Sequence, residues 1–206
     1  GVQTCALPIW DGRLIAAQAF GHRVIEYRFG PKGPRGARVL LDDPTLNQPN
    51  DVIQAPTGDI YFTDPDFSAR ARSAVYLLRP RGEKIRLISE MPLPNGLKLS
   101  PDGRTLYVGD SHEKLWRAYP ILRNGVTGPG RVFFNPDTPN QADPDGMSVD
   151  EHGNLYLTGR GGVWVVDPSG KPLGLIPVKE FCSNVTFGGN DGRDLYITCN
   201  GRVYTL

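Results

Sequence analysis

The sequence has almost no helical periodicity and no long hydrophobic run. Nothing in its 206 residues approaches the roughly 20 consecutive apolar residues that a membrane-spanning helix needs. A charge excess of either sign is also absent, since 23 basic residues face 22 acidic ones, for a formal net charge of +1. This balance predicts no membrane partner and no nucleic-acid partner.

Cysteine is scarce, and its three copies form no Cys-x-x-Cys or Cys/His group of the kind that binds zinc. Cys182 and Cys199 flank the last expected hairpin at roughly opposing positions. A disulfide between them is therefore possible, although two separate, partly buried thiols are the favoured interpretation. The cellular compartment stays open between bacterial cytoplasm and periplasm.

Glycine and proline are abundant and scattered, with 25 and 19 copies that separate short runs of alternating hydrophobicity. This pattern predicts an all-β protein. The clearest unit is Pro94–Asp110: we interpret Asn95-Gly96 as the tip of a turn, and Asp102-Gly103 as the turn that sends the next strand back antiparallel. The same pattern begins again at Asn50, Asp145 and Asn184, at spacings of roughly 40 to 50 residues.

Most of these hairpins are followed by a third strand, which carries a large aromatic residue, and then by a fourth strand. Four strands per unit match the blade of a β-propeller better than a β-sandwich. The first unit lacks its first strand and the last ends after its third, so we expect roughly four and a half blades. The expected innermost strands are 50–55, 95–100, 145–150 and 184–188.

The first nine residues, Gly1 to Ile9, show no hydrophobic period and no relation to the repeat. The string resembles the translation of a sequencing adapter, so we interpret it as foreign and place the propeller domain at residues 10–206. A natural tail or a signal-peptide remnant is the alternative. We expect the segment to make few contacts and to take no place in a blade.

The starts of the innermost strands carry the candidate chemistry. Equivalent positions in successive blades lie on one ring around the axis, and here they hold Asn50, Asn95, Asp145 and Asn184. Oxygen ligands of this type suit a calcium-like cation better than a transition metal. Alternatively, each Asn or Asp is only a turn residue.

With these residues the sequence from Gly12 to Leu206 resembles the senescence marker protein, gluconolactonase and luciferin-regenerating enzyme family of six-bladed propellers, and its bacterial gluconolactonases above all. The motifs that carry the resemblance, in chain order, are Leu46-Asn47-Gln48-Pro49-Asn50-Asp51-Val52, Tyr61-Phe62-Thr63-Asp64-Pro65, Pro94-Asn95-Gly96-Leu97, Ser100-Pro101-Asp102-Gly103, Pro144-Asp145-Gly146-Met147 and Cys182-Ser183-Asn184-Val185-Thr186-Phe187-Gly188-Gly189.

The resemblance implies hydrolysis of a small sugar lactone with a divalent cation, with Ca²⁺ as the expected ion and Zn²⁺ or Mg²⁺ as alternatives. Asn95 and Asp145 would be metal ligands, and Asn50 a further ligand that also faces substrate. Asp145 would double as the catalytic carboxylate that takes a proton from the attacking water. Asp51 and Asp64 are substrate-contact candidates, with turn and strand-end roles as the alternative.

Two departures from the family pattern bear on this assignment. A Glu followed by Gly-Pro, a further family ligand near the start of the chain, is absent, and Gln48 stands where some members have Arg. With one carboxylate left we expect weak cation affinity and impaired activity. The alternatives are a non-catalytic binding propeller and a strictosidine-synthase-like propeller. Asp110, Ser111 and His112 are consecutive at a strand end, so their side chains diverge and predict no catalytic triad.

Overall fold

The computed structural model describes residues 4–5, 9–10, 13–137 and 143–206. This part of the chain contains twenty strands and one short 3-10 helix, η1 (Ala19–Gly21). The expected all-β architecture with negligible helix is confirmed. Among the described residues, no helix has the length and apolar character to cross a membrane.

The strands form five antiparallel sheets. In four of them each strand pairs with the next one along the chain, whereas in the first sheet β1 and β2 both pair with β3. The first two sheets contain β1 (Thr4–Cys5), β2 (Ile9–Trp10), β3 (Arg13–Gln18), β4 (Arg23–Gly30) and β5 (Gly33–Asp42), and then β6 (Val52–Gln54), β7 (Ile60–Asp64), β8 (Ala74–Leu78) and β9 (Lys84–Ile88). The other three contain β10 (Pro94–Leu99), β11 (Thr105–Asp110), β12 (Leu115–Pro120) and β13 (Arg131–Phe134), then β14 (Met147–Val149), β15 (Leu155–Gly159), β16 (Gly162–Val166) and β17 (Pro172–Pro177), and last β18 (Cys182–Gly188), β19 (Asp194–Cys199) and β20 (Val203–Thr205).

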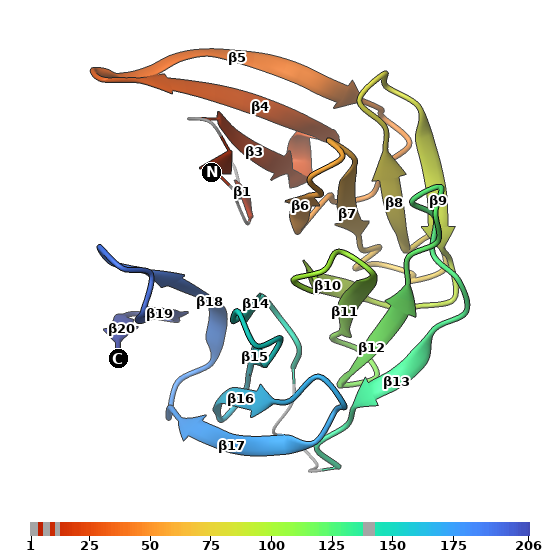
Figure 1. The fold of residues 1–206 in the computed structure, drawn as a ribbon. Helices are drawn as coiled ribbons and strands as arrows, with labels where there is room; N and C mark the ends of the chain where they lie inside the picture. Colours follow the sequence, from red (N-terminus) through yellow and green to blue (C-terminus); the bar gives the residue numbers. More distant parts are fainter. Residues whose placement is uncertain (1–3, 6–8, 11–12, 138–142) are drawn as a thin grey trace.

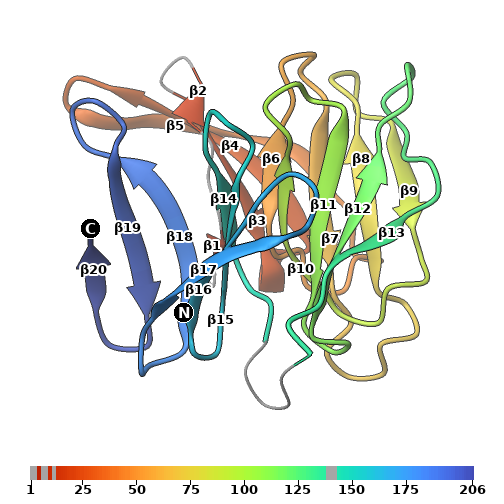
Figure 2. The ribbon, with the colours of Figure 1, turned by 60° about the horizontal axis from the view of Figure 1, so that its bottom comes forward.

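The five sheets are arranged like blades around one axis, with β6, β10, β14 and β18 nearest to it (Figure 1). The first sheet and the last lie on either side of an opening, and Figure 2 shows the same sheets from the side. The fold is therefore a β-propeller of five blades. The expectation of roughly four and a half blades of a six-bladed ring is corrected, because the first sheet has an additional strand, β1, on the inner side of β3.

That additional strand also corrects the expectation for the first nine residues. Thr4 and Cys5 pair with Gln18 and Ala17, and Ile9 pairs with Leu14, so parts of this segment do join a blade. The physical reason is that a strand edge offers unpaired N–H and C=O groups, which any extended segment can satisfy whatever its side chains. Residues 1–3 and 6–8 lie outside the described residues, and the origin of the segment stays a prediction.

The hairpins between the first and second strands of the last four sheets have the predicted glycine-containing turns. Each of the four turns has a glycine with positive φ, at +88°, +67°, +84° and +73° for Gly58, Gly103, Gly153 and Gly192. The innermost strands lie where they were predicted, although β6 and β14 are shorter by a few residues.

Apolar side chains fill the space between each pair of neighbouring sheets, so the core is divided into four clusters. Burying one large aliphatic or aromatic side chain contributes roughly 1.5–3 kcal/mol. The third-strand aromatics join these clusters: Trp116 and Trp164 lie 5.7 and 5.4 Å from the ring of Phe134. Buried residues that represent the four clusters in chain order are Phe62, Leu77, Trp116 and Ile197.

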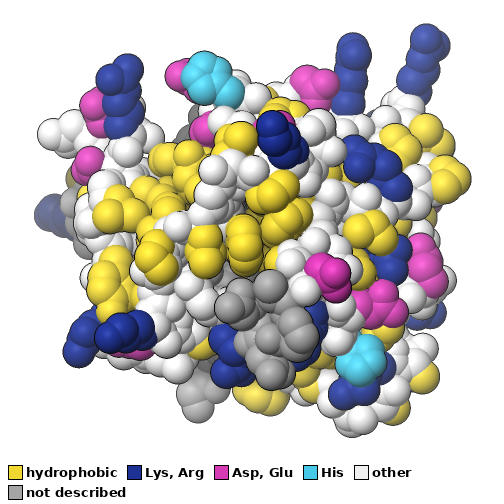
Figure 3. Space-filling view, turned by 90° about the horizontal axis from the view of Figure 1, so that it is seen from below, with side chains coloured by type: hydrophobic (Ala, Val, Ile, Leu, Met, Phe, Trp, Pro, Cys, Tyr) yellow, Lys and Arg dark blue, Asp and Glu magenta, His cyan; other side chains and the backbone are white. Residues whose placement is uncertain are grey.

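The outermost strands contribute less to these clusters. Val132 in β13 and Leu173 and Leu175 in β17 are exposed. Figure 3, seen from below, shows hydrophobic side chains gathered on the surface of this side of the molecule.

The innermost strands approach one another so closely that two positions require glycine. Gly96 lies inside β10, next to a bulge, and its φ is not in the left-handed region, so the expected Asn-Gly turn tip is wrong. A Cβ atom added there would overlap the carbonyl oxygen of Asp145, on the neighbouring blade. A Cβ on Gly146 would overlap the side chain of Asn184, on the blade after that. Glycine thus permits close packing here.

We predict that Gly96→Ala lowers the free energy of unfolding by about 1–3 kcal/mol, because the backbone of Asp145 must move aside. Gly174→Ala in β17 is the matched control, since a Cβ there meets no atom within 4 Å. Urea unfolding followed by tryptophan fluorescence measures both. Equal midpoints for the two variants would contradict the close approach.

Candidate functional site

The ring positions lie together at the start of successive innermost strands. Asn50 and Asp145 precede β6 and β14, while Asn95 and Asn184 lie in β10 and β18. The approach of Gly96 to Asp145, and of Gly146 to Asn184, brings the last three positions into one neighbourhood. The N–H of Gly146 also donates to the carbonyl of Ser183 at 2.9 Å. The predicted register is therefore present in the structure.

The amide group of Asn95 has a defined orientation. The hydroxyl of Ser111 donates its hydrogen to the carbonyl of Pro144 and accepts from Asn95 Nδ2 at 3.1 Å. Because a hydroxyl has only one hydrogen to donate, this arrangement makes Nδ2 the donor and turns Oδ1 away from Ser111. Oδ1 is buried and has no hydrogen-bond partner among the described residues.

The side-chain oxygen of Asn50 also lacks a partner among the described residues, whereas that of Asn184 has one. The backbone N–H of Asn50 donates to the carbonyl of Thr63 at 2.9 Å, but its Oδ1 is buried without a partner in the described part of the chain. Oδ1 of Asn184 accepts from the N–H of Val185 at 2.9 Å. A buried polar atom without a hydrogen bond costs free energy, so Asn50 and Asn95 each present an oxygen that a ligand would satisfy.

Two carboxylates and one amine share this region. Burial and then the charge of Asp51 raise the pKa of Asp145 to about 8. Burial raises the pKa of Asp51 to about 6, while the nearby Lys98 charge opposes the rise. Burial lowers the pKa of Lys98, opposed in turn by Asp51. Asp51 therefore loses its proton before Asp145, and its negative charge holds the proton on Asp145.

Asp64 is placed differently from the other candidates. Its side chain is fully buried, and its two carboxylate oxygens accept from the backbone N–H of Asn47 at 2.9 and 3.0 Å. Asn47 Nδ2 donates to the same carboxylate at 3.0 Å. Asp64 thus holds the loop that leads to Asn50, and it has no exposed surface to offer a substrate in this structure.

The expectation that Asp110, Ser111 and His112 form no triad agrees with their contacts. Asp110 is fully buried, and its Oδ1 accepts from the backbone N–H groups of His112 and Glu113 at 2.9 and 3.0 Å. Its carboxylate therefore closes a turn, and the Ser111 hydroxyl is engaged by Asn95 and Pro144.

The donor set fits a hard cation. Among the described residues, no three His, Cys, Asp or Glu side chains gather as a metal site. Asn50 and Asn95 each have an amide oxygen without a partner among the described residues, the backbone of Asp145 approaches Gly96 next to Asn95, and oxygen donors are what Ca²⁺ takes. With a single carboxylate the set is poor in charge, which predicts weak affinity.

Sequence reasoning missed the roles of Lys98 and Ser111. Lys98 stands between Leu97 and Leu99 in an innermost strand, where alternation sends it to the face opposite the leucines, and this was the available signal. Ser111 gave no such signal, because its contacts with Asn95 and Pro144 join strand ends that are far apart in sequence.

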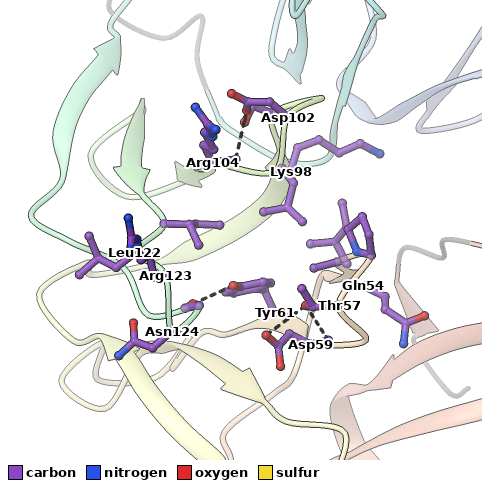
Figure 4. A pocket seen from close by; sticks show the side chains of 18 of the residues that line it. Gln54, Thr57, Asp59, Tyr61, Lys98, Asp102, Arg104, Leu122, Arg123 and Asn124 are labelled. Carbon is purple, nitrogen blue, oxygen red and sulfur yellow. Dashed lines mark hydrogen bonds between the residues drawn. The ribbon is translucent and has the colours of Figure 1, made fainter.

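A cavity of about 1020 Å³ lies at the far ends of β6 and β10 from Asn50 and Asn95 (Figure 4). Its lining includes Tyr61, whose hydroxyl donates to the carbonyl of Gly125 at 2.7 Å, and Asp59, which pairs with Arg79 at 2.9 Å. Lys98 lines it too, and its side chain extends away from Asn124 in Figure 4. The residues that line the cavity include Lys98 but none of the ring residues Asn50, Asn95, Asp145 and Asn184.

Comparison with known proteins agrees with this geometry. Residues 1–201 match the family model described as SMP-30/Gluconolactonase/LRE-like region. A gluconolactonase from Zymomonas mobilis is 32% identical over an alignment of 178 positions, which covers 77% of this chain and 49% of that protein. The chain thus spans about half the length of this curated relative.

Solved structures show the same fold. One described as a candidate gluconolactonase superposes with a TM-score of 0.84 at 29% identity, covering 98% of this chain and 72% of its own. A gluconolactonase from Xanthomonas campestris gives a TM-score of 0.71 at 28% identity, with coverages of 100% and 86%. A calcium-binding regucalcin from Agrobacterium tumefaciens gives 0.79 at 22% identity, with coverages of 96% and 68%, and this likeness concerns the fold alone.

We predict that, with a chelator present, wild-type stability falls as pH rises from about 4 to 8, and that Asp145→Asn reduces this loss. The folded-state pKa of Asp145, about 8, exceeds its unfolded value of 3.8, so the folded state keeps a proton that the unfolded chain releases in this window. The two proteins should match near pH 4 and differ by a few kcal/mol near pH 8.

Urea unfolding at pH 4, 6 and 8 measures this difference. Asp191→Asn is the control, because Asp191 is exposed and should leave the pH dependence unchanged. Parallel pH profiles for the wild type and Asp145→Asn would contradict the raised pKa.

Proposed function

The chain belongs to the SMP-30/gluconolactonase/LRE-like family, and we propose that it hydrolyses a sugar lactone with a divalent cation at Asn50, Asn95 and Asp145. The relatives named gluconolactonase and lactonase support this reaction class and a small-molecule lactone substrate. The proposal concerns the activity of the whole protein, because this chain spans only a part of the length of these relatives.

One observation carries the proposal. Asn50 and Asn95, at the inner ends of successive blades, each bury an amide oxygen that has no partner among the described residues, and the backbone of Asp145, whose pKa burial raises to about 8, approaches Gly96 next to Asn95. Each unpaired oxygen costs free energy that a ligand would recover. A cation would satisfy the amide oxygens and favour the ionised form of Asp145.

Each side chain then has a defined part in the reaction. A bound cation would supply the Lewis acid that polarises the lactone carbonyl. Asp145, partly exposed at the strand start, takes the proton from the attacking water. Ser111 holds the Asn95 amide with its oxygen turned away from Ser111. Asp51 and Lys98 set the local charge, and Asp51 remains a candidate substrate contact.

Calcium is the expected cation because every donor is oxygen. Zn²⁺ prefers nitrogen and sulfur, and Mg²⁺ demands a stricter octahedral geometry. The solved regucalcin from Agrobacterium tumefaciens is described as a calcium-binding protein. The single carboxylate leaves one formal charge against a dication, so binding and activity should be weak.

We predict that the 206-residue chain binds Ca²⁺ weakly and that Asn95→Ala lowers the affinity at least tenfold, because it removes the oriented Oδ1. Isothermal titration calorimetry measures the binding. Asn190→Ala, at an exposed position, is the control and should bind as the wild type does. Unchanged binding by Asn95→Ala would remove Asn95 from the ligand set.

We predict that Asp145→Asn lowers lactone hydrolysis by about 10²–10⁴-fold in saturating calcium, because the base is lost while the shape is kept. A pH-indicator assay with glucono-δ-lactone measures the rate after subtraction of spontaneous hydrolysis, and Asp191→Asn is the control. Near-normal turnover by Asp145→Asn would overturn its catalytic role. Calcium binding without turnover in the wild type would contradict lactone hydrolysis by this chain and leave a cation-binding propeller.

A further inference from the structure

Cys182 and Cys199 lie opposite each other on the adjacent strands β18 and β19 of the last blade. They are register partners on β18 and β19, and the N–H of Asn200 donates to the carbonyl of Phe181 at 3.1 Å just beside them. That flanking bond makes Cys182 and Cys199 a non-hydrogen-bonded pair of the antiparallel ladder. Such pairs have Cα atoms about 4.5 Å apart, within the range of roughly 4.4–6.8 Å that a disulfide spans.

The two sulfur atoms are close and enclosed. Their Sγ atoms lie 2.6 Å apart, and both residues are buried within the cluster that contains Val163, Val185 and Ile197. The remaining polar contact of Cys182 Sγ in the described part is a weak one, 3.7 Å from the carbonyl of Glu180. The thiols are unbonded in this structure, but each has the other as its nearest chemical partner.

We propose that Cys182 and Cys199 form a cross-strand disulfide by exchange with a low-molecular-weight disulfide such as oxidised glutathione. The thiolate of one cysteine attacks a sulfur of the oxidant, which releases one glutathione thiolate and leaves a mixed disulfide. The second cysteine attacks the protein sulfur of that mixed disulfide and releases the second glutathione. Two electrons and the two thiol protons pass from the protein pair to the two glutathione molecules.

The bond forms while the last blade is folding. In the folded state, burial and the neighbouring Cys199 raise the pKa of Cys182 to about 12, so little thiolate is present there. Before β18–β20 packs against its neighbour, both thiols are open to solvent and have ordinary reactivity. Once made, the bond joins the strand that carries Asn184 to the next strand, in the one described sheet that has three strands.

The test uses the Cys5→Ser variant, which leaves only this pair. The protein is unfolded and then refolded with oxidised and reduced glutathione. It is denatured again in the presence of N-ethylmaleimide, which alkylates free thiols, and its intact mass is measured by mass spectrometry. We expect no maleimide adduct, a mass lower by two hydrogens, and a linked Cys182–Cys199 peptide on digestion. Two adducts per chain, or a persistent glutathione adduct on either cysteine, would overturn the proposal.

Thermal unfolding gives the second readout. The bond closes a loop whose ends are 17 positions apart, so the oxidised protein should melt about 6–12 °C above the reduced protein. Cys182→Ala with Cys199→Ala, in the Cys5→Ser background, is the control and should melt at one temperature in both conditions. Equal melting temperatures of the oxidised and the reduced protein would contradict a stabilising bond. The mass measurement does not depend on the control variant, so it tests the proposal even if that variant fails to fold.

Discussion

The close approach of innermost strands around the axis is the constraint on which this protein depends. Backbone meets backbone at Gly96 and Asp145, and backbone meets side chain at Gly146 and Asn184. A Cβ at either glycine would force a neighbouring atom to shift, and the residue before each glycine, Asn95 or Asp145, lies close to the start of its strand. The same packing that allows successive blades to approach therefore gathers the Asn and Asp side chains at one end of the axis.

Gathering polar groups in this way has an energetic cost, which the rest of the fold offsets. Unpaired amide oxygens at Asn50 and Asn95, and carboxyl groups with raised pKa values at Asp51 and Asp145, all weaken the folded state when no ligand is present. Four apolar clusters between the sheets supply the opposing stabilisation. Stability resides between the blades, while the candidate chemistry lies at their inner ends.

Several site residues act through others, and these were the hardest to interpret from sequence. Asp64 belongs to the Phe-Thr-Asp-Pro motif and was a candidate substrate contact, with a strand-end role as the alternative. Its carboxylate accepts hydrogen bonds from the Asn47 backbone, and the substrate contact stays a prediction. Ser111 was considered only as a member of an excluded triad, yet it orients Asn95. The hydrogen bonds that define these roles join residues 16 to 17 positions apart, which no local pattern encodes.

The sequence by itself determined the strands, the hairpin turns at residues such as Gly103, and the common register of Asn50, Asn95 and Asp145, because alternation and turn chemistry are local and repeat from blade to blade. Only the tertiary structure decided that Gly96 serves packing and not a turn, that Thr4–Cys5 joins the first sheet, and that the charge of Lys98 acts on the pKa of Asp51. Each of these depends on which segment lies opposite, and the space and charge there are set by residues distant in the chain.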